Sequence, residues 1–228
     1  MSVLDAKGIG EVIYEFLTTN KNLALFAGAG VGAQAGLPTW PQLMEHLAKV
    51  VDSYEPLAGQ LIRKRTKSGY YLNAAVVYKT CSEIPRGELY EQLAIPFRSP
   101  SSPQKLQALV SLPFSAVFTT NYDRSLHDAF ASVFGKSAAT VELGDPTMDK
   151  APFITKFYIA RIHGREEVPE TIVLSEDDYR RIEKDESYMD FVRHILTRYS
   201  CLFLAYFPHL SNWIERQDDP AMRRQSSL

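Results

Sequence analysis

The sequence predicts an α/β fold with a doubly wound, mostly parallel sheet. Leu23–Ala27 is a short unbroken apolar run, as expected for a strand that is buried on both faces, and 114–118 and 157–162 are two further strand-like segments. Segments with helical periodicity, such as 7–20 and 124–134, separate these runs. Because strands that alternate with helices form parallel sheets whose faces the helices cover, the pattern favours the α/β class.

The remaining segments complete this organisation. Between the first two strands the periodicity is helical over about 40–110, which predicts a helical lobe inserted into a single domain spanning 1–228. A looser stretch follows the helix at 124–134. Beyond the third strand we expect a further strand at 171–174, one or two helices over 177–199 and the apolar run 201–205, and then a tail at 207–228 with no assigned structure.

Composition and charge exclude several classes of protein. The formal net charge of −2 offers no positive field for a nucleic-acid backbone, so no direct nucleic-acid binding is expected. The N-terminal acidic residues do not fit a signal peptide, and the apolar runs are too short to span a bilayer, so we expect a cytoplasmic protein with no membrane contact. Cys81 and Cys201 lack neighbours at zinc-ligand spacing; they are expected to be small buried hydrophobes, with no metal site.

A glycine-rich turn follows the first strand. Residues 28–33, Gly-Ala-Gly-Val-Gly-Ala, fit a loose dinucleotide pattern, in which small residues let the backbone approach a pyrophosphate. The alternative is a tight turn whose small residues serve packing only. A dehydrogenase would next show a second strand and an acidic residue about 20 positions on, but residues 36–40, Gly-Leu-Pro-Thr-Trp, break the chain instead. Hydride transfer is therefore disfavoured.

Polar residues follow the second and third strands. Thr120, Asn121 and Asp123 come after the second strand, and His163 with Gly164 after the third. Open α/β sheets collect their ligands at these carboxyl ends. Asn121 or Asp123 could instead cap the helix at 124, and a lone histidine is commonly structural. A neutral imidazole at a strand end can also act as acid or base. The other four histidines lie in helices or in the tail and are expected to be structural: His46, His127, His194 and His209.

Taken in order, these stretches resemble the sirtuin superfamily, and most closely its prokaryotic branch from antiphage defence. Residues 28–30 and 36–38 resemble the first glycine-rich motif, 120–123 the Asn/Asp motif, and 163–164 the His-Gly motif. The resemblance covers about residues 8–206, with 172–175 and Tyr179 as further matches. It implies a Rossmann-like, sirtuin-like sheet and NAD⁺ as the substrate.

The sequence also departs from the family pattern. Protein-deacylating sirtuins insert a four-cysteine zinc module after the His-Gly motif, but here only a few residues separate Gly164 from Thr171. Gly32 stands where sirtuins usually have serine, and residues 39–41 replace an Asp-Phe-Arg segment. Residues 205–208 replace a turn beside the adenosine of NAD⁺. The earlier departures weaken a deacylase assignment. The change at 205–208 makes the adenosine contact the least supported part of the implied NAD⁺ binding.

The resemblance implies an NAD⁺ glycohydrolase that releases nicotinamide and ADP-ribose and depletes NAD⁺ in antiphage defence. It assigns Asn121 and His163 as catalytic residues: Asn121 orients the ribose and the attacking water, and His163 acts as a base. The implied cofactor-binding residues are Gly28, Ala29, Gly30, Pro38, Trp40, Thr120 and Asp123. The alternatives are an NAD-dependent deacylase or ADP-ribosyltransferase, and an inactive NAD or ADP-ribose sensor.

An enzyme that drains its host's cofactor requires an off state, so a homo-oligomer or a separate sensor protein is expected as a partner. The helical lobe carries Tyr70, Tyr71, Tyr78 and Tyr90. Aromatic residues anchor protein interfaces, which makes this lobe the candidate docking surface. The alternative is that these tyrosines pack within the lobe.

Overall fold

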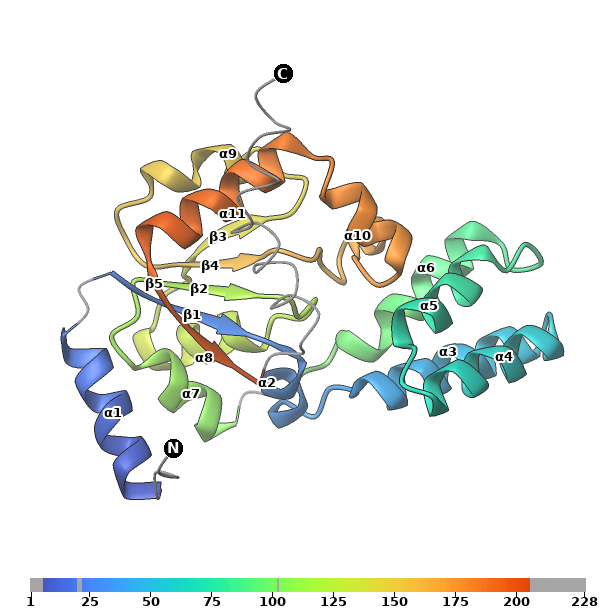
Figure 1. Cartoon of the computed structure of the whole chain (residues 1–228), viewed down its shortest axis with the longest axis horizontal. Coiled ribbons are helices and arrows are strands. Elements are labelled where there is room, and N and C mark those ends of the chain that lie inside the picture. Colours follow the sequence, from blue (N-terminus) through green and yellow to red (C-terminus); the bar gives the residue numbers. More distant parts are fainter. Residues whose placement is uncertain (1–5, 20–21, 102, 206–228) are drawn as a thin grey trace, which may run out of the picture.

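The predicted doubly wound α/β fold is confirmed. The computed structural model describes residues 6–19, 22–101 and 103–205, and within them five strands form one parallel sheet (Figure 1). The strand order is β3-β4-β2-β1-β5. The strands are β1 (Leu23–Ala27), β2 (Ala116–Thr119), β3 (Ala139–Glu142), β4 (Tyr158–Arg161) and β5 (Ser200–Leu204). The tail at 207–228 lies outside the described residues.

Helices cover both faces of the sheet. Successive side chains of a strand point to opposite faces, so Leu25 and Phe26 of β1 enter different cores. One core includes side chains from α7 (Gln104–Val110) and α8 (Ser125–Phe134), and the other from α9 (Thr147–Lys150) and α11 (Glu186–Arg198). Figure 1 shows these pairs of helices on opposite sides of the strands. The remaining elements of the sheet part are α1 (Ala6–Thr19), α2 (Ala29–Gln34), α10 (Glu176–Ile182), η2 (Ala151–Phe153) and η3 (Pro169–Thr171).

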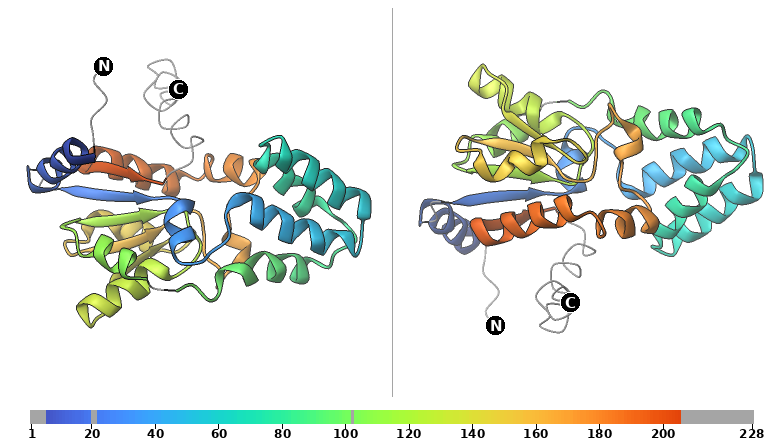
Figure 2. Two further views of the ribbon diagram at one scale, coloured as in Figure 1. Left: turned by 90° about the horizontal axis from the view of Figure 1, so that it is seen from below. Right: turned by 90° about the horizontal axis from the view of Figure 1, so that it is seen from above.

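Four of the helices between β1 and β2 form a lobe that extends beyond the carboxyl ends of the strands (Figures 1 and 2). They are α3 (Trp40–Asp52), α4 (Pro56–Lys67), α5 (Tyr71–Thr80) and α6 (Arg86–Ala94), followed by η1 (Ile95–Phe97). A capping box begins α3, in which the Thr39 amide donates to Gln42 Oε1 at 2.8 Å. Among the described helices, none combines the length and the apolar composition that a bilayer crossing requires.

The tyrosines of this lobe differ in their surroundings. Tyr78 is fully buried and its hydroxyl donates to Leu89 O at 2.6 Å, while the Tyr71 ring lies against Trp40 with ring centroids 5.8 Å apart. Tyr90 packs partly buried against the core, and Tyr70 is 63% exposed. Packing within the lobe therefore accounts for Tyr71, Tyr78 and Tyr90. Docking of a partner on this lobe remains a prediction.

Two strand predictions are corrected by the structure. The expected strand at 171–174 is instead the end of η3 followed by a buried extended segment outside the sheet. Its polar groups find other partners: the Val173 amide donates to His163 O at 2.9 Å, and Val173 O accepts from the Tyr122 hydroxyl at 2.8 Å. Conversely, the stretch read as looser contains β3, an edge strand whose first two residues are only partly buried. Its short, mixed sequence lacks the apolar run that marks a central strand.

Candidate active site

A cavity lies at the carboxyl ends of β1, β2 and β4, where the sheet meets the helical lobe. The space between its lining atoms, including the part open to solvent, is about 780 Å³. The lining comes from both parts of the molecule: Ala29, Gly32, Leu37, Pro38, Trp40, Leu43, Leu72, Phe97, Thr120, Asn121, Tyr122, Asp123, His163 and Tyr179. This is the place at which a parallel sheet is expected to bind its ligand.

Asn121 is held by two hydrogen bonds, one from its side chain and one from its backbone. Its amide Nδ2 donates to Gly28 O at 3.1 Å, and its backbone N–H donates to Thr119 Oγ1 at 3.1 Å. Within the described residues, the side-chain amide oxygen of Asn121 accepts no hydrogen bond. The first two strand ends thus fix the orientation of the side chain, which lines the cavity with its acceptor available to a ligand.

Gly32 explains one departure from the family pattern. A Cβ built at this position would lie 3.1 Å from Asn121 Nδ2, closer than ordinary van der Waals contact. A serine here would therefore press on the Asn121 amide. Glycine at 32 and the present orientation of Asn121 are matched to one another.

His163 is buried and neutral. It is 3% exposed, and its Nε2 has no hydrogen-bond partner among the described residues. Burial lowers the pKa of His163 to about 3, so the imidazole is uncharged at neutral pH. The edge of its ring meets the Tyr179 ring at 90°, with ring centroids 5.3 Å apart. A neutral ring with an unpaired nitrogen can accept a hydrogen bond from a ligand.

The turn after His163 requires glycine. Gly164 has φ +90°, a left-handed conformation that side chains disfavour, and a Cβ there would collide with the Thr171 carbonyl. The close approach of these two segments brings Val173 beside His163. Gly164 thus supports the position of the histidine that precedes it.

The two carboxylate oxygens of Asp123 differ in their hydrogen bonds. Oδ1 accepts from the Ser125 amide at 2.7 Å, an Asx-turn contact just before α8, whose N-cap residue is Arg124 and not Asp123. Oδ2 has no partner among the described residues, although the side chain is 3% exposed. Burial raises the pKa of Asp123, against the lowering effect of its bonds to Ser125. One oxygen thus serves the helix and the other is available to a donor.

The structure brings most of the sequence-predicted site residues together. Ala29, Pro38, Trp40 and Thr120 line the cavity with Asn121, Asp123 and His163. Gly28 and Gly30 do not line it.

The amides of these two glycines are engaged by the end of β5. The Gly28 N–H donates to Leu204 O at 3.0 Å, and the Gly30 N–H donates to Ala205 O at 3.4 Å. A Cβ at Gly30 would lie 2.7 Å from Ala205 Cβ, so this glycine admits the close approach of β5. Contact of Gly28 and Gly30 with a pyrophosphate remains a prediction.

Arg161 was missed by sequence reasoning. It ends β4 at 1% exposure, and one guanidinium nitrogen donates to Tyr122 O at 3.0 Å and to Glu166 Oε2 at 2.9 Å. The other terminal nitrogen donates to Glu142 Oε1 at 2.8 Å. Arg161 therefore anchors the loop that carries Asn121 and Asp123. An arginine inside an otherwise apolar strand was the available signal, because a buried charge requires partners.

The fold and cavity define a Rossmann-like α/β domain with a cavity at its strand ends. Residues 115–209 match the family model described as "SIR2-like domain". This match, over part of the chain, supports the sirtuin-like resemblance that the sequence predicts.

Curated relatives carry related names. The chain is 24% identical over 188 residues to "NAD(+) hydrolase ThsA" of Bacillus cereus (strain MSX-D12), covering 82% of this chain and 37% of that protein. It is 27% identical over 176 residues to the protein of the same name from Enterococcus faecium, covering 75% and 33%. To "Defense-associated sirtuin 2" of Bacillus subtilis it is 26% identical over 225 residues, covering 90% and 21%. The chain thus spans about a third or less of the length of most of these relatives.

Proposed function

We propose that this chain hydrolyses NAD⁺ at its nicotinamide-ribose bond and acts in antiphage defence. The observation that carries the proposal is the cavity, in which Asn121, Asp123 and His163 lie among aromatic side chains while no lysine or arginine is among the lining residues that the structure describes. A cationic pyridinium ring is favoured by aromatic faces and by a carboxylate, whereas a phosphate is not. The names of the relatives, NAD(+) hydrolase and defense-associated sirtuin, support the same activity.

The reaction replaces one bond at the ribose carbon by another. The carbon–nitrogen bond breaks, and its electron pair leaves with nicotinamide, which becomes neutral. A water oxygen bonds to the same carbon and gives up a proton, so the products are nicotinamide, ADP-ribose and one proton. The carbon passes through an oxocarbenium-like state, as in the hydrolysis of other glycosides.

The described side chains suit this chemistry. Asn121 presents its amide oxygen to a ribose hydroxyl or to the attacking water, and the neutral His163 accepts a hydrogen bond from either. We assign the unpaired Oδ2 of Asp123 as an acceptor on the nicotinamide side of the substrate. Trp40, Leu72 and Phe97 cover the cavity from the lobe and limit access of other water molecules.

The decisive experiment is incubation of the purified chain with NAD⁺ and separation of the products by chromatography. We expect nicotinamide and ADP-ribose in equal amounts. Nicotinamide release that requires a peptide would instead identify a deacylase or an ADP-ribosyltransferase. Binding of NAD⁺ or ADP-ribose without any nicotinamide release would identify a sensor and overturn the proposal.

We also propose that full activity requires assembly with further copies of the chain or with a separate sensor protein. The relatives are much longer than the segments that match this chain, which supports a role for further protein parts in the active form. Specific activity should then rise with protein concentration or on co-expression of a partner. Full specific activity in a dilute, demonstrably monomeric sample would contradict this part of the proposal.

A further inference from the structure

The helical lobe is joined to α10 by a shielded ion pair. Lys79 Nζ on α5 lies 2.6 Å from Asp178 Oδ1 on α10, and the two side chains are 15% and 9% exposed. On the same helix, Arg180 forms an ion pair with Glu176 whose side chains are 64% and 43% exposed. Exposed pairs contribute little to geometry or stability, whereas shielded pairs are screened much less. The Lys79–Asp178 pair therefore links the lobe to α10 through shielded charges, whereas the Arg180–Glu176 pair is exposed and lies within α10.

Asp178 is fixed on its other side as well. Its Oδ2 accepts from the Leu174 amide at 3.1 Å, the Ser175 amide at 2.8 Å and the Ser175 hydroxyl at 2.7 Å. Residues 172–175 are the buried segment that passes His163, where the Val173 amide donates to His163 O. A carboxylate with this many donors has one defined position, so Lys79 meets a rigid partner.

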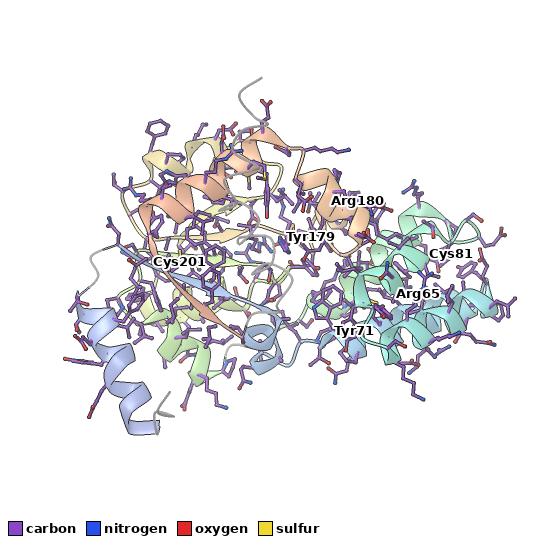
Figure 3. All side chains as sticks on the ribbon, viewed as in Figure 1. Arg65, Tyr71, Cys81, Tyr179, Arg180 and Cys201 are labelled. Atoms are coloured by element: carbon purple, nitrogen blue, oxygen red, sulfur yellow. The ribbon has the colours of Figure 1, made fainter. Side chains whose placement is uncertain are left out.

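Tyr179, the next residue on α10, lies on the cavity side. It is one of the lining residues, and its ring meets the His163 ring edge-on at 5.3 Å between centroids. Figure 3 shows Tyr179 at the junction between the sheet and the lobe. The two neighbouring residues of this helix thus contact the lobe and the histidine, respectively.

The opposite end of α5 reaches the same cavity. Leu72 lines the cavity directly, and Tyr71 lies against Trp40, which also lines it. One helix therefore contacts the cavity cover at its first turn and α10 at its last turn. A shift of α5 would move the cover and the Tyr179–His163 contact together.

We propose that Lys79 is a positioning residue, whose ion pair with Asp178 holds the lobe over the cavity and holds Tyr179 against His163. The proposal rests on the proposed NAD⁺ hydrolysis. Lys79 acts through Asp178 and Tyr179 and does not line the cavity. A misplacement of about 1 Å in such a site can cost up to about 100-fold in rate.

The test compares Lys79→Met and Lys79→Arg with Arg180→Met, a matched control that removes an exposed ion pair from the same helix. We expect Lys79→Met to lower kcat between about 10-fold and 100-fold with a smaller change in KM. Lys79→Arg keeps the positive charge and should retain most of the wild-type kcat. Arg180→Met should stay within about twofold of wild type. A Lys79→Met enzyme with wild-type kcat would overturn the proposal.

A second readout does not depend on turnover. NMR of the histidine rings, with His163 assigned from the spectrum of His163→Gln, should show shifted His163 signals in Lys79→Met and unchanged ones in Arg180→Met. Unchanged His163 signals in Lys79→Met would also overturn the proposal. If Lys79→Met does not fold, Lys79→Gln is measured in the same way and decides. If the wild type releases no nicotinamide, the proposed function fails, while the ring signals still test the coupling.

Discussion

The strand ends and the helical lobe differ in whether their buried polar atoms have hydrogen-bond partners. At the strand ends, Asp123 Oδ2 and His163 Nε2 are buried with no partner among the described residues. In the lobe, the buried Tyr78 hydroxyl is bonded to Leu89 O. Unpaired buried polar atoms are costly, so the two that line the cavity are candidates to meet polar groups of a ligand, whereas those of His127 and His194 lie outside the cavity lining. The comparison indicates that the strand ends supply the polar groups of the proposed reaction, while the lobe supplies side chains that cover the cavity.

The largest effect should come from removing a polar group at the strand ends. Asn121→Ala and His163→Ala should each lower NAD⁺ cleavage about 10²- to 10⁴-fold, because a positioned acceptor is lost while the fold is kept. His46→Ala, in the lobe and outside the cavity, is the matched control and should retain activity. Turnover at the wild-type rate by folded His163→Ala would remove His163 from the mechanism and break the comparison.

Loss of the buried arginine beneath these loops should affect the fold itself. Arg161→Met leaves Glu142 and Glu166 without their cation and should lower the free energy of unfolding by about 3–5 kcal/mol. Urea unfolding measures the change. Arg165→Met, which loses a longer contact of 4.0 Å to Glu142, serves as the control and should change stability far less. Equal effects of the two variants would contradict a central role for Arg161.

Removing part of the cover should weaken binding more than chemistry. Trp40→Ala deletes an aromatic ring that lines the cavity and should raise KM for NAD⁺ about tenfold, which corresponds to about 1.4 kcal/mol. Leu57→Ala, at a side chain that is 80% exposed in the same lobe, should leave KM unchanged. A fall in kcat with constant KM in Trp40→Ala would assign the lobe a part in the chemical step.

The smallest effect concerns a buried histidine outside the cavity. Both ring nitrogens of His127 lack a partner among the described residues, and burial lowers its pKa to about 3. The unfolded chain binds a proton below about pH 6.5 that the folded chain excludes, so His127 reduces stability as the pH falls from 6.5 towards 3.

Replacement of His127 by leucine tests this sign. His127→Leu should match wild-type stability at pH 7 and exceed it by about 1 kcal/mol near pH 5.5. Thermal or urea unfolding at both pH values measures the difference. A gain of the same size at both pH values would show that packing, and not titration, is responsible.

Much of the fold could be predicted because burial leaves a periodic trace in the sequence. Leu23–Ala27 has the predicted bounds, and α8 (Ser125–Phe134) differs from the predicted helix at 124–134 by one residue, since an unbroken apolar run and a helical period each have one favourable structure. The segment 171–174 was read as a strand on equally apolar grounds. Its apolar residues predict that it is buried but not that it joins the sheet. Its backbone groups form hydrogen bonds with Asp178, Tyr122 and His163 instead.

The sequence by itself determined which residues follow the central strands, and hence that Asn121, Asp123 and His163 meet at one edge, because parallel strands end on the same side of a sheet. Only the tertiary structure decided which residues position these side chains and which cover the cavity. Lys79 meets Asp178 across 99 positions and Arg161 reaches Tyr122 O across 39. Such pairs are set by how packed elements meet in space, and no local periodicity or propensity encodes them.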